Sequence, residues 1–352
     1  MRINKLLTLW LFQSVFFVST STAQSTSDLE ELTGNVEQIT ASFIQHYQQQ
    51  LGMPQACIER QNNLVNVCSG SLRNDGNGPY IMHHNAPTEW VIVLFHGLSD
   101  SPYYLRSIAK DLHDAGMTVV VGLLPGHGLK QADQDMQDPG LSDRWKSEVE
   151  TITAMTRPLG QKMMVGGFST GGTLATHYAL RHSDDVSGLI LLSGALALSD
   201  SAERMSRVWG MQFITKLVDG DYQTFNPNPY KYPGVALFAV IELMEVIRQV
   251  RELVAVQPLT IPIFAAHSLS DVSTPYAGVE SLVESSEAPH SLFLIDEKYE
   301  LCHGDLPLNE QQVKDMAVVM PEDEFVEICT IPEANPLHGQ MMIMMKNFIQ
   351  QK

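Results

Sequence analysis

One short motif in this chain of 352 residues has the residue types of a nucleophilic site. The stretch Gly167–Gly171 fits the pattern G-x-S-x-G, with Ser169 at its centre. An apolar run at 162–165 precedes the motif, and a helical pattern over Thr170–Arg181 follows it. This order predicts a sharp strand-to-helix turn, which exposes the serine hydroxyl and needs glycines where a Cβ would clash. We therefore predict that Ser169 is a catalytic nucleophile.

A serine of this kind needs a carboxylate partner farther along the chain. The hydroxyl becomes nucleophilic when a histidine takes its proton and a carboxylate orients that histidine, and in a strand–turn–helix site the acid follows the serine. Asp271 lies in the loop after the predicted strand Ile261–Ala266, at the edge of the sheet where Ser169 is expected. We predict that Asp271 is the acid. The alternative is a turn aspartate that caps the next helix.

Three histidines follow this acid, and they differ in their expected positions. His290 precedes a predicted strand and so lies at the wrong edge of the sheet. His303 lies 32 positions after Asp271, in the loop that follows that strand. His338 lies at the start of the last predicted helix. We predict that His303 is the general base, and His338 remains the alternative.

The negative charge that develops on an attacked carbonyl oxygen needs hydrogen-bond donors. The amide of Leu98 follows a buried apolar run, and the amide of Thr170 opens the helix after the nucleophile. We predict that these two amides form the oxyanion hole, where loss of one donor typically costs about a hundredfold or more in rate. His96 and His127 lie in turns, and we assign them structural roles.

Four motifs occur in a characteristic order along the chain. They are His96-Gly97, the L-P-G-H-G stretch Leu124–Gly128, the G-F-S-T-G-G stretch Gly167–Gly172 and the D-x-x-x-P stretch Asp271–Pro275. With these motifs, the chain from about Tyr80 onward resembles the monoacylglycerol-lipase-like and carboxylesterase-like branch of the α/β-hydrolases, which also includes serine aminopeptidases. The resemblance implies a triad without a metal or an organic cofactor.

The chain departs from this family pattern at two places. Thr170 replaces the more usual bulky apolar residue after the nucleophile. An extra stretch, Asp305–Glu333, follows His303, where the family usually runs quickly into its last helix. This second departure is why His338 stays the alternative base.

From Tyr80 onward, apolar runs alternate with helical patterns, which is typical of a mainly parallel, doubly wound α/β sheet. The predicted strands are Trp90–Phe95, Met117–Val121, Lys162–Val165, Gly188–Leu192, Ile261–Ala266 and Ser291–Ile295. The predicted helices are Tyr103–Ala115, Arg144–Met155, Thr170–Arg181, Ala277–Ser285 and Gly339–Gln350, the last with a methionine cluster that we assign to the core.

The interval between two of these strands is longer than a simple crossover needs. It contains helical material at Ser201–Leu217 and Val235–Val254 around a stretch rich in Pro, Asn and Tyr. We predict an inserted helical cap over residues 195–258, above the carboxyl edge of the sheet. We expect its apolar side chains to contact an acyl chain, namely Val235, Leu237, Phe238, Val240, Ile241 and Leu243.

The N-terminal region has its own composition. Residues 1–23 combine a basic start, an apolar stretch at Leu6–Val18 and small residues ending at Ala23, which is the order of a secretory signal peptide. The alternative is a membrane anchor, but the apolar stretch is shorter than the roughly 20 residues that span a bilayer. We therefore predict a secreted or periplasmic protein without stable membrane insertion. Residues 24–79 form an N-terminal extension before the hydrolase domain, 80–352.

Charge and cysteines limit the partners further. The net charge is −18 over the full sequence, which repels phosphate backbones and makes nucleic acid a poor partner. The four cysteines predict two disulfides in an oxidising compartment. A hairpin of Ala56–Glu59 with Val65–Ser69, turning at Asn62-Asn63, would pair Cys57 with Cys68, which leaves Cys302 to pair with Cys329.

Together these features predict a serine hydrolase that cleaves carboxylic esters through an acyl-enzyme. The expected partner is a small ester or lipid with an uncharged acyl group, such as a monoacylglycerol. The alternative is a peptidase or amidase that uses the same triad and binds a substrate amine through Glu242 and Glu245. A third possibility is a binding protein on an inactive hydrolase scaffold.

Overall fold

The computed structural model describes residues 26–57, 63–208, 211–220, 227–318, 329 and 331–352. Eight strands form one sheet in the order β1-β2-β4-β3-β5-β6-β7-β8. β2 is antiparallel to its neighbours β1 and β4, and the other neighbouring strands are parallel. The strands are β1 Leu64–Asn66, β2 Tyr80–Met82, β3 Thr88–Phe95, β4 Thr118–Gly122, β5 Gly160–Phe168, β6 Gly188–Leu192, β7 Ile263–Ser268 and β8 His290–Ile295.

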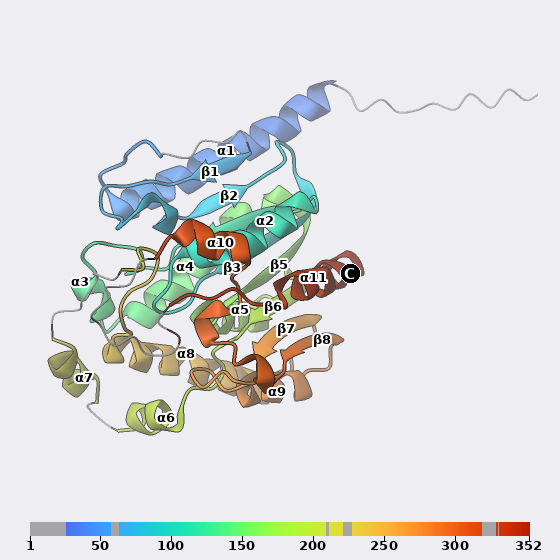
Figure 1. Cartoon of the computed structure of the whole chain (residues 1–352). Coiled ribbons are helices and arrows are strands. Elements are labelled where there is room, and N and C mark those ends of the chain that lie inside the picture. Colours follow the sequence, from blue (N-terminus) through green and yellow to red (C-terminus); the bar gives the residue numbers. More distant parts are fainter. Residues whose placement is uncertain (1–25, 58–62, 209–210, 221–226, 319–328, 330) are drawn as a thin grey trace, which may run out of the picture.

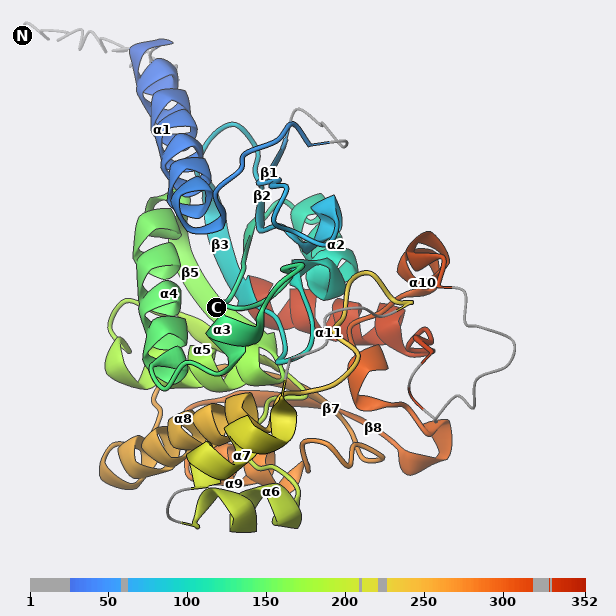
Figure 2. The same ribbon diagram turned by 90° about the vertical axis from the view of Figure 1, so that its left-hand side faces the viewer.

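Helices cover both faces of this sheet (Figures 1 and 2). The α-helices are α1 Thr26–Leu51, α2 Arg106–Asp114, α3 Asp133–Met136, α4 Leu141–Thr156, α5 Thr170–Arg181, α6 Asp200–Ser206, α7 Met211–Asp219, α8 Leu237–Val256, α9 Ala277–Glu284, α10 Glu310–Met316 and α11 His338–Gln350. The short 3-10 helices are η1 Asp75–Asn77, η2 Pro102–Leu105, η3 Arg157–Leu159, η4 Glu297–Tyr299 and η5 His303–Asp305.

The central strand β3 shows why the sheet is covered twice. Its side chains alternate between two faces, as in any strand. Val91, Val93 and Phe95 join one buried cluster, to which α1, α4, α5, α8 and α9 contribute. Trp90, Ile92 and Leu94 join a second cluster with α2 and α11. The continuous apolar run therefore marks a strand that is buried on both faces, and the predicted doubly wound α/β sheet is confirmed.

The predicted elements of the sheet agree closely with the structure. The six predicted strands correspond to β3–β8, and α5 has the predicted bounds. In α11, Met341, Met342 and Met345 are at most 1% exposed, which confirms that the methionine cluster packs in the core.

The predicted N-terminal hairpin has the wrong register. Leu64–Asn66 pairs with the distant strand β2, with Val65 opposite Ile81. Pro54, rather than Ala56, lies opposite Ser69. Residues 64–66 instead form an edge strand of the main sheet through their pairing with β2, and residues 58–62, which include the expected Asn62 turn position, lie outside the described part. Cys57 and Cys68 are nevertheless joined by a disulfide, with Cα atoms 5.3 Å apart.

The interval 195–258, predicted to be a single cap, contributes to two different layers. α6 and α7 are inserted between β6 and α8, whereas α8 packs against α5 and α4 on the face of the sheet. α8 is therefore the helix of the β6–β7 crossover. Phe238, Ile241 and Leu243 of α8 are buried, with 2%, 7% and 2% of their surface exposed. Val235, before the start of α8, is 43% exposed. The expected contact of these side chains with an acyl chain stays a prediction.

The N-terminal extension packs into the same core as the rest of the chain. Three side chains of α1 belong to the buried cluster that includes Trp145 of α4, namely Val36, Phe43 and Tyr47. β1 adds a strand at the edge of the sheet, beside β2. The proposed signal peptide, residues 1–23, lies outside the described residues. Within the described part of the chain, no helix is long and apolar enough to cross a membrane.

Candidate active site

Ser169 stands at the turn between β5 and α5, in a strained backbone conformation with φ 53° and ψ −117°. A left-handed φ is costly for a residue with a side chain, so the surrounding structure must hold it in place. The flanking glycines allow this close packing. A Cβ on Gly167 would lie 2.4 Å from the carbonyl oxygen of Phe95, and one on Gly171 would lie 1.9 Å from the same oxygen. The predicted turn is therefore present, and both glycines are required by space.

His303 lies beside this serine, in the loop after β8. Its Nε2 is 2.9 Å from Ser169 Oγ, and its Nδ1 is 2.6 Å from Asp271 Oδ2. Since an ionised carboxylate can only accept, Nδ1 carries a proton, and Nε2 of the neutral ring is free to accept from the serine hydroxyl. The imidazole also packs on Phe168, with ring centroids 4.8 Å apart. The structure thus brings together the three residues singled out from the sequence.

Asp271 is buried in the loop after β7 and is held by its neighbours. Its Oδ1 accepts from the amides of Ser273 and Thr274 at 2.9 and 3.0 Å, and its Oδ2 accepts from the Thr274 hydroxyl at 3.0 Å. Burial raises the pKa of Asp271, but the charge and hydrogen bond of His303 and the Thr274 amide outweigh that effect, so the pKa lies below its usual value. The carboxylate is therefore ionised at neutral pH and fixed in orientation.

A second histidine lies behind the acid and was not singled out from the sequence. His267 is fully buried, and its Nε2 donates to the Thr274 carbonyl oxygen at 2.7 Å and lies 3.7 Å from Asp271 Oδ2. Burial lowers the pKa of His267, so its ring is neutral near pH 7. His267 thus supports the turn that contains Ser273 and Thr274, the residues that donate hydrogen bonds to Asp271. Its position four residues before the acid, at the end of a strand, is the signal that could have revealed it.

The other two histidines after the acid lie away from Ser169. His338 is buried at the start of α11, where its Nε2 is 3.3 Å from Ser107 Oγ and its Nδ1 is 3.9 Å from Asp111 Oδ2. His290 is exposed at the beginning of β8, at the opposite end of that strand from the His303 loop. Of the three, only His303 contacts the serine.

The loop after β3 is held by two buried histidines. His96 Nδ1 donates to the carbonyl oxygen of Gly97 at 2.8 Å, and His96 Nε2 accepts from the amide of Leu124 at 3.1 Å. His127 Nε2 donates to the carbonyl oxygen of Leu98 at 2.7 Å. Burial lowers the pKa of both rings, which keeps them neutral. Both histidines therefore bond to the backbone on either side of the predicted oxyanion donor.

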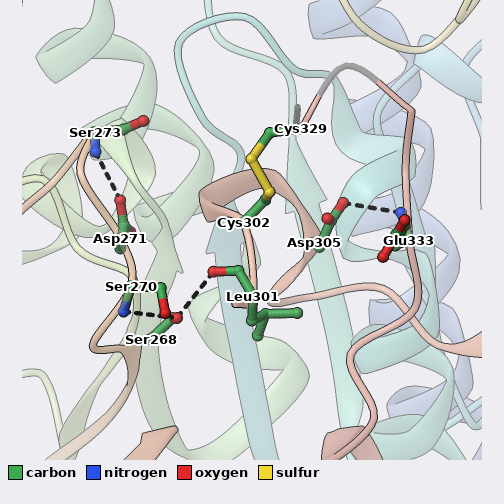
Figure 3. The surroundings of a disulfide bond; sticks show 9 residues. All are labelled: Ser268, Ser270, Asp271, Ser273, Leu301, Cys302, Asp305, Cys329 and Glu333. Atoms are coloured by element: carbon green, nitrogen blue, oxygen red, sulfur yellow. Dashed lines mark hydrogen bonds between the residues drawn. A yellow bond between two sulfur atoms is a disulfide. The ribbon is translucent and has the colours of Figure 1, made fainter. Parts of the chain in front are cut away.

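A disulfide between Cys302 and Cys329 joins the residue before His303 to the far end of the extra stretch (Figure 3). Nearby, the Ser268 hydroxyl donates to the Leu301 carbonyl oxygen at 2.9 Å. Asp305 Oδ1 accepts from the amide of Glu333 at 3.1 Å, which gives a second link across the same stretch. Burial raises the pKa of Asp305 to about 7, against the lowering effects of the Glu333 amide and Lys231. The histidine loop is thus tied to distant residues on both sides of His303.

Metal binding finds no support in the described ranges. Within them, no group of three His, Cys, Asp or Glu side chains is arranged to hold a metal ion. All four cysteines are in disulfides.

The sheet order, the serine at the β5–α5 turn and the acid after β7 define an α/β-hydrolase. Residues 86–305, more than half of the chain, match the serine aminopeptidase family S33, and the chain belongs to that family. The matched range contains Ser169, Asp271 and His303 and ends before His338.

One similar protein of known sequence is a lipase by name. A thermostable monoacylglycerol lipase of Bacillus sp. (strain H-257) is 25% identical over 160 residues, which are 46% of this chain and 62% of that lipase. The alignment thus spans less than two thirds of that relative.

Two solved structures share the fold. A monoacylglycerol lipase from Paleococcus ferrophilus superimposes with a TM-score of 0.54 at 16% identity, covering 78% of this chain and 99% of that one. A soluble variant of monoglyceride lipase from Saccharomyces cerevisiae has a TM-score of 0.54 at 12% identity, covering 86% and 98%. At these identities, the similarity is one of fold.

Proposed function

We propose that the protein is a serine hydrolase that cleaves carboxylic esters through an acyl-enzyme. One observation carries the proposal: Ser169, His303 and Asp271 are connected by hydrogen-bond distances of 2.9 and 2.6 Å in the order of a catalytic triad. The strained turn at Ser169 and the ionised, fully bonded Asp271 support it, because both hold reactive groups in place before the substrate arrives.

The proposed reaction has two steps. In the first, His303 Nε2 takes the proton of Ser169 Oγ, which attacks the ester carbonyl, and the imidazolium then gives that proton to the leaving alcohol. In the second, His303 takes a proton from water, the resulting hydroxide attacks the acyl-enzyme, and the proton returns to Ser169 as the acid leaves. Asp271 keeps Nδ1 protonated and stabilises the imidazolium in both steps.

The amides of Leu98 and Thr170 are the proposed oxyanion hole. Thr170 is the first residue of α5, so its N–H has no partner within the helix and lies at the positive end of the helix dipole. In a trans peptide the N–H points opposite to the preceding carbonyl. Because His96 holds the Gly97 carbonyl, it also fixes the direction of the Leu98 N–H.

The contacts of Glu242 and Glu245, the two carboxylates expected to bind a substrate amine, favour an ester over an amide as the substrate. Glu242 is buried and accepts from the amide and hydroxyl of Ser142, at 3.2 and 2.8 Å, at the start of α4. Glu245 pairs with Arg248 and Gln249 on the same helix. Neither carboxylate therefore binds a substrate amine in the way the peptidase alternative requires. The relatives named as lipases support a small ester or monoacylglycerol-like lipid with an uncharged acyl group as the substrate.

The proposed location is outside the cytoplasm, secreted or periplasmic. Two disulfides join all four cysteines, and disulfides persist in oxidising compartments. Mass spectrometry of the N-terminus of the protein recovered from its natural host tests this directly. A mature chain that begins at Gln24 supports the proposal, and an intact Met1 contradicts it.

A paired substrate screen tests the reaction. Nitrophenyl esters of uncharged acids, from acetate to laurate, should be hydrolysed with a higher kcat/KM than the nitroanilides of alanine, leucine and proline. Ser169→Ala should abolish all of these activities while circular dichroism and the melting temperature stay unchanged. Faster cleavage of the aminoacyl nitroanilides would favour the peptidase alternative.

A further inference from the structure

Residues 227–233, here called the strap, lead from the inserted helices into α8 and cross the loop between β3 and α2. The amide of Tyr232 donates to the carbonyl oxygen of Ser99 at 2.7 Å. In the opposite direction, the hydroxyl of Ser101 in the loop donates to the carbonyl oxygen of Tyr230 in the strap at 2.9 Å. The strap thus lies directly along the loop that follows the proposed oxyanion donor.

The N-terminal extension holds the strap from the other side. Arg73 donates to the carbonyl oxygens of Lys231 and Asn228 at 2.7 and 3.2 Å. Asn77 donates to the carbonyl oxygen of Pro229 at 3.0 Å. Backbone bonds of this kind restrict an irregular segment that has no helix or strand to support it. The point where the Lys231 side chain leaves the backbone is therefore well defined.

The Lys231 side chain extends from the strap to the catalytic histidine loop. Its Nζ is 3.5 Å from Asp100 Oδ1. It also lies against Gly304, the residue after His303, since a Cβ on Gly304 would be only 3.1 Å from Nζ. The Lys231 charge acts on Asp305 as well. One ammonium therefore lies between the oxyanion loop and the histidine loop.

The two carboxyl groups around this ammonium are buried, but the ammonium is not. Asp100 and Asp305 are 4% and 5% exposed, whereas the Lys231 side chain is 28% exposed. Within the described ranges, Asp100 Oδ1 is a buried atom without a hydrogen-bond partner. Asp100 and Lys231 therefore form an ion pair at 3.5 Å that is not also a hydrogen bond. A plain structural salt bridge explains the pairing with Asp100. It does not explain why the charge lies on the accessible side, against Gly304.

We propose that Lys231 is a specificity-determining residue: its ammonium fills an acidic subsite next to His303 and so selects uncharged substrates over cationic ones. This inference rests on the proposed ester hydrolysis. With Lys231 in place, a substrate cation meets a like charge at the position where the buried Asp100 carboxylate would otherwise attract it. Without Lys231, the Asp100 carboxylate forms a subsite for a substrate ammonium group.

Matched ester pairs that differ only in charge test this inference. The first pair is choline butyrate and its carbon isostere dimethylbutyl butyrate, with the charge on the alcohol. The second pair is the nitrophenyl esters of trimethylammoniobutanoic acid and of its carbon isostere dimethylhexanoic acid, with the charge on the acyl group. For each pair, the ratio of kcat/KM for the cationic ester to that for the neutral ester is measured. This ratio is unaffected by a general loss of active enzyme.

In Lys231→Ala, the ratio should rise by about tenfold or more for at least one pair. Lys231→Arg, which keeps the charge, should stay within about twofold of the wild type. Adding Asp100→Asn to Lys231→Ala should bring the ratio back down, because the nearest carboxylate is then neutral. The matched control is Lys162→Ala. It removes an equal charge near the start of β5, where Lys162 forms an ion pair with Glu89 of β3, and its ratio should not change.

The outcomes separate this inference from the proposed function. If Lys231→Ala hydrolyses the neutral esters and its ratios equal those of the wild type, the role of Lys231 is overturned, but the proposed ester hydrolysis is not. An equal rise in Lys162→Ala also overturns it, because the effect would then come from net charge. If the wild type hydrolyses none of the four esters, the proposed ester hydrolysis falls, and this inference falls with it.

Discussion

Ser169 Oγ and His303 Nε2 are 2.9 Å apart, but the chain positions these two residues by different kinds of contact. Ser169 is placed by its immediate neighbours: β5 ends at Phe168, α5 begins at Thr170, and adjacent glycines make room for the turn. His303 lies in a loop whose supports come from far along the chain. Cys302 is bonded to Cys329, and the Leu301 carbonyl accepts from Ser268.

This difference separates a locally determined residue from a tertiary one. The serine turn is encoded by a few neighbouring residues, and it fits against β3 and β6, where the Ser169 amide donates to the Leu192 carbonyl oxygen at 2.9 Å. The histidine reaches the serine only when distant segments, including the region after Cys329, are in place. We therefore expect replacement of Ser169 itself to act on the chemistry alone, whereas changes far from His303 in sequence act on the position of its side chain.

The largest expected effect distinguishes His303 from His338. Replacing His303 with Ala should reduce kcat by about ten thousand-fold or more, because the serine then has no base. His338→Ala should retain activity within about tenfold, since its ring contacts Ser107 rather than Ser169. Steady-state hydrolysis of a nitrophenyl ester measures both. An inactive, folded His338→Ala together with an active His303→Ala would reverse the assignment.

A smaller effect should distinguish the two disulfides. Each disulfide closes a loop, and its removal lowers the free energy of unfolding by about 3 kcal/mol in the chain-entropy model. The double variant Cys302→Ser with Cys329→Ser should also lower kcat by about tenfold to a hundredfold, and more than it raises KM, because His303 loses its neighbouring anchor. The double variant Cys57→Ser with Cys68→Ser is the control and should lose stability only. Equal effects of both variants on kcat would show that neither disulfide positions the histidine.

The smallest effect concerns Asp305, two residues after His303. Its pKa in the folded protein is about 7, against 3.8 as the ordinary value, because burial disfavours its charge. Between these pH values the folded state binds more protons than the unfolded state, so stability falls as the pH rises through this range. Asp305→Asn should therefore raise the free energy of unfolding at pH 8 by roughly 1–3 kcal/mol and change it little at pH 4. Urea denaturation at the two pH values measures this, and equal changes at both would contradict it.

The sequence predicts the local parts of this molecule well and the distant contacts poorly. The bounds of α5 and the places of the six parallel strands β3–β8 follow from apolar runs, glycines and the serine motif. The register at Val65 does not, because its partner Ile81 belongs to a separate segment. The layer of α8 does not follow either, since an apolar helical face has the same pattern whether it covers a substrate or packs on α5.

The candidate site divides along the same line. Ser169 and Asp271 each follow a recognisable strand, and a motif marks them. His303 could be predicted only by elimination among three histidines. Lys231 carries no motif, and its position depends on bonds from Arg73, which lies 158 positions earlier in the chain. Such contacts become visible only in the folded structure.

The central claim, that His303 activates Ser169, can be tested most directly with a fluorophosphonate probe. Peptide mapping by mass spectrometry should find a single labelled residue, Ser169, in the wild type and none in Ser169→Ala. Labelling should be strongly slowed in His303→Ala and close to the wild-type rate in His338→Ala. A label on another residue, or labelling that needs His338 rather than His303, would contradict the account.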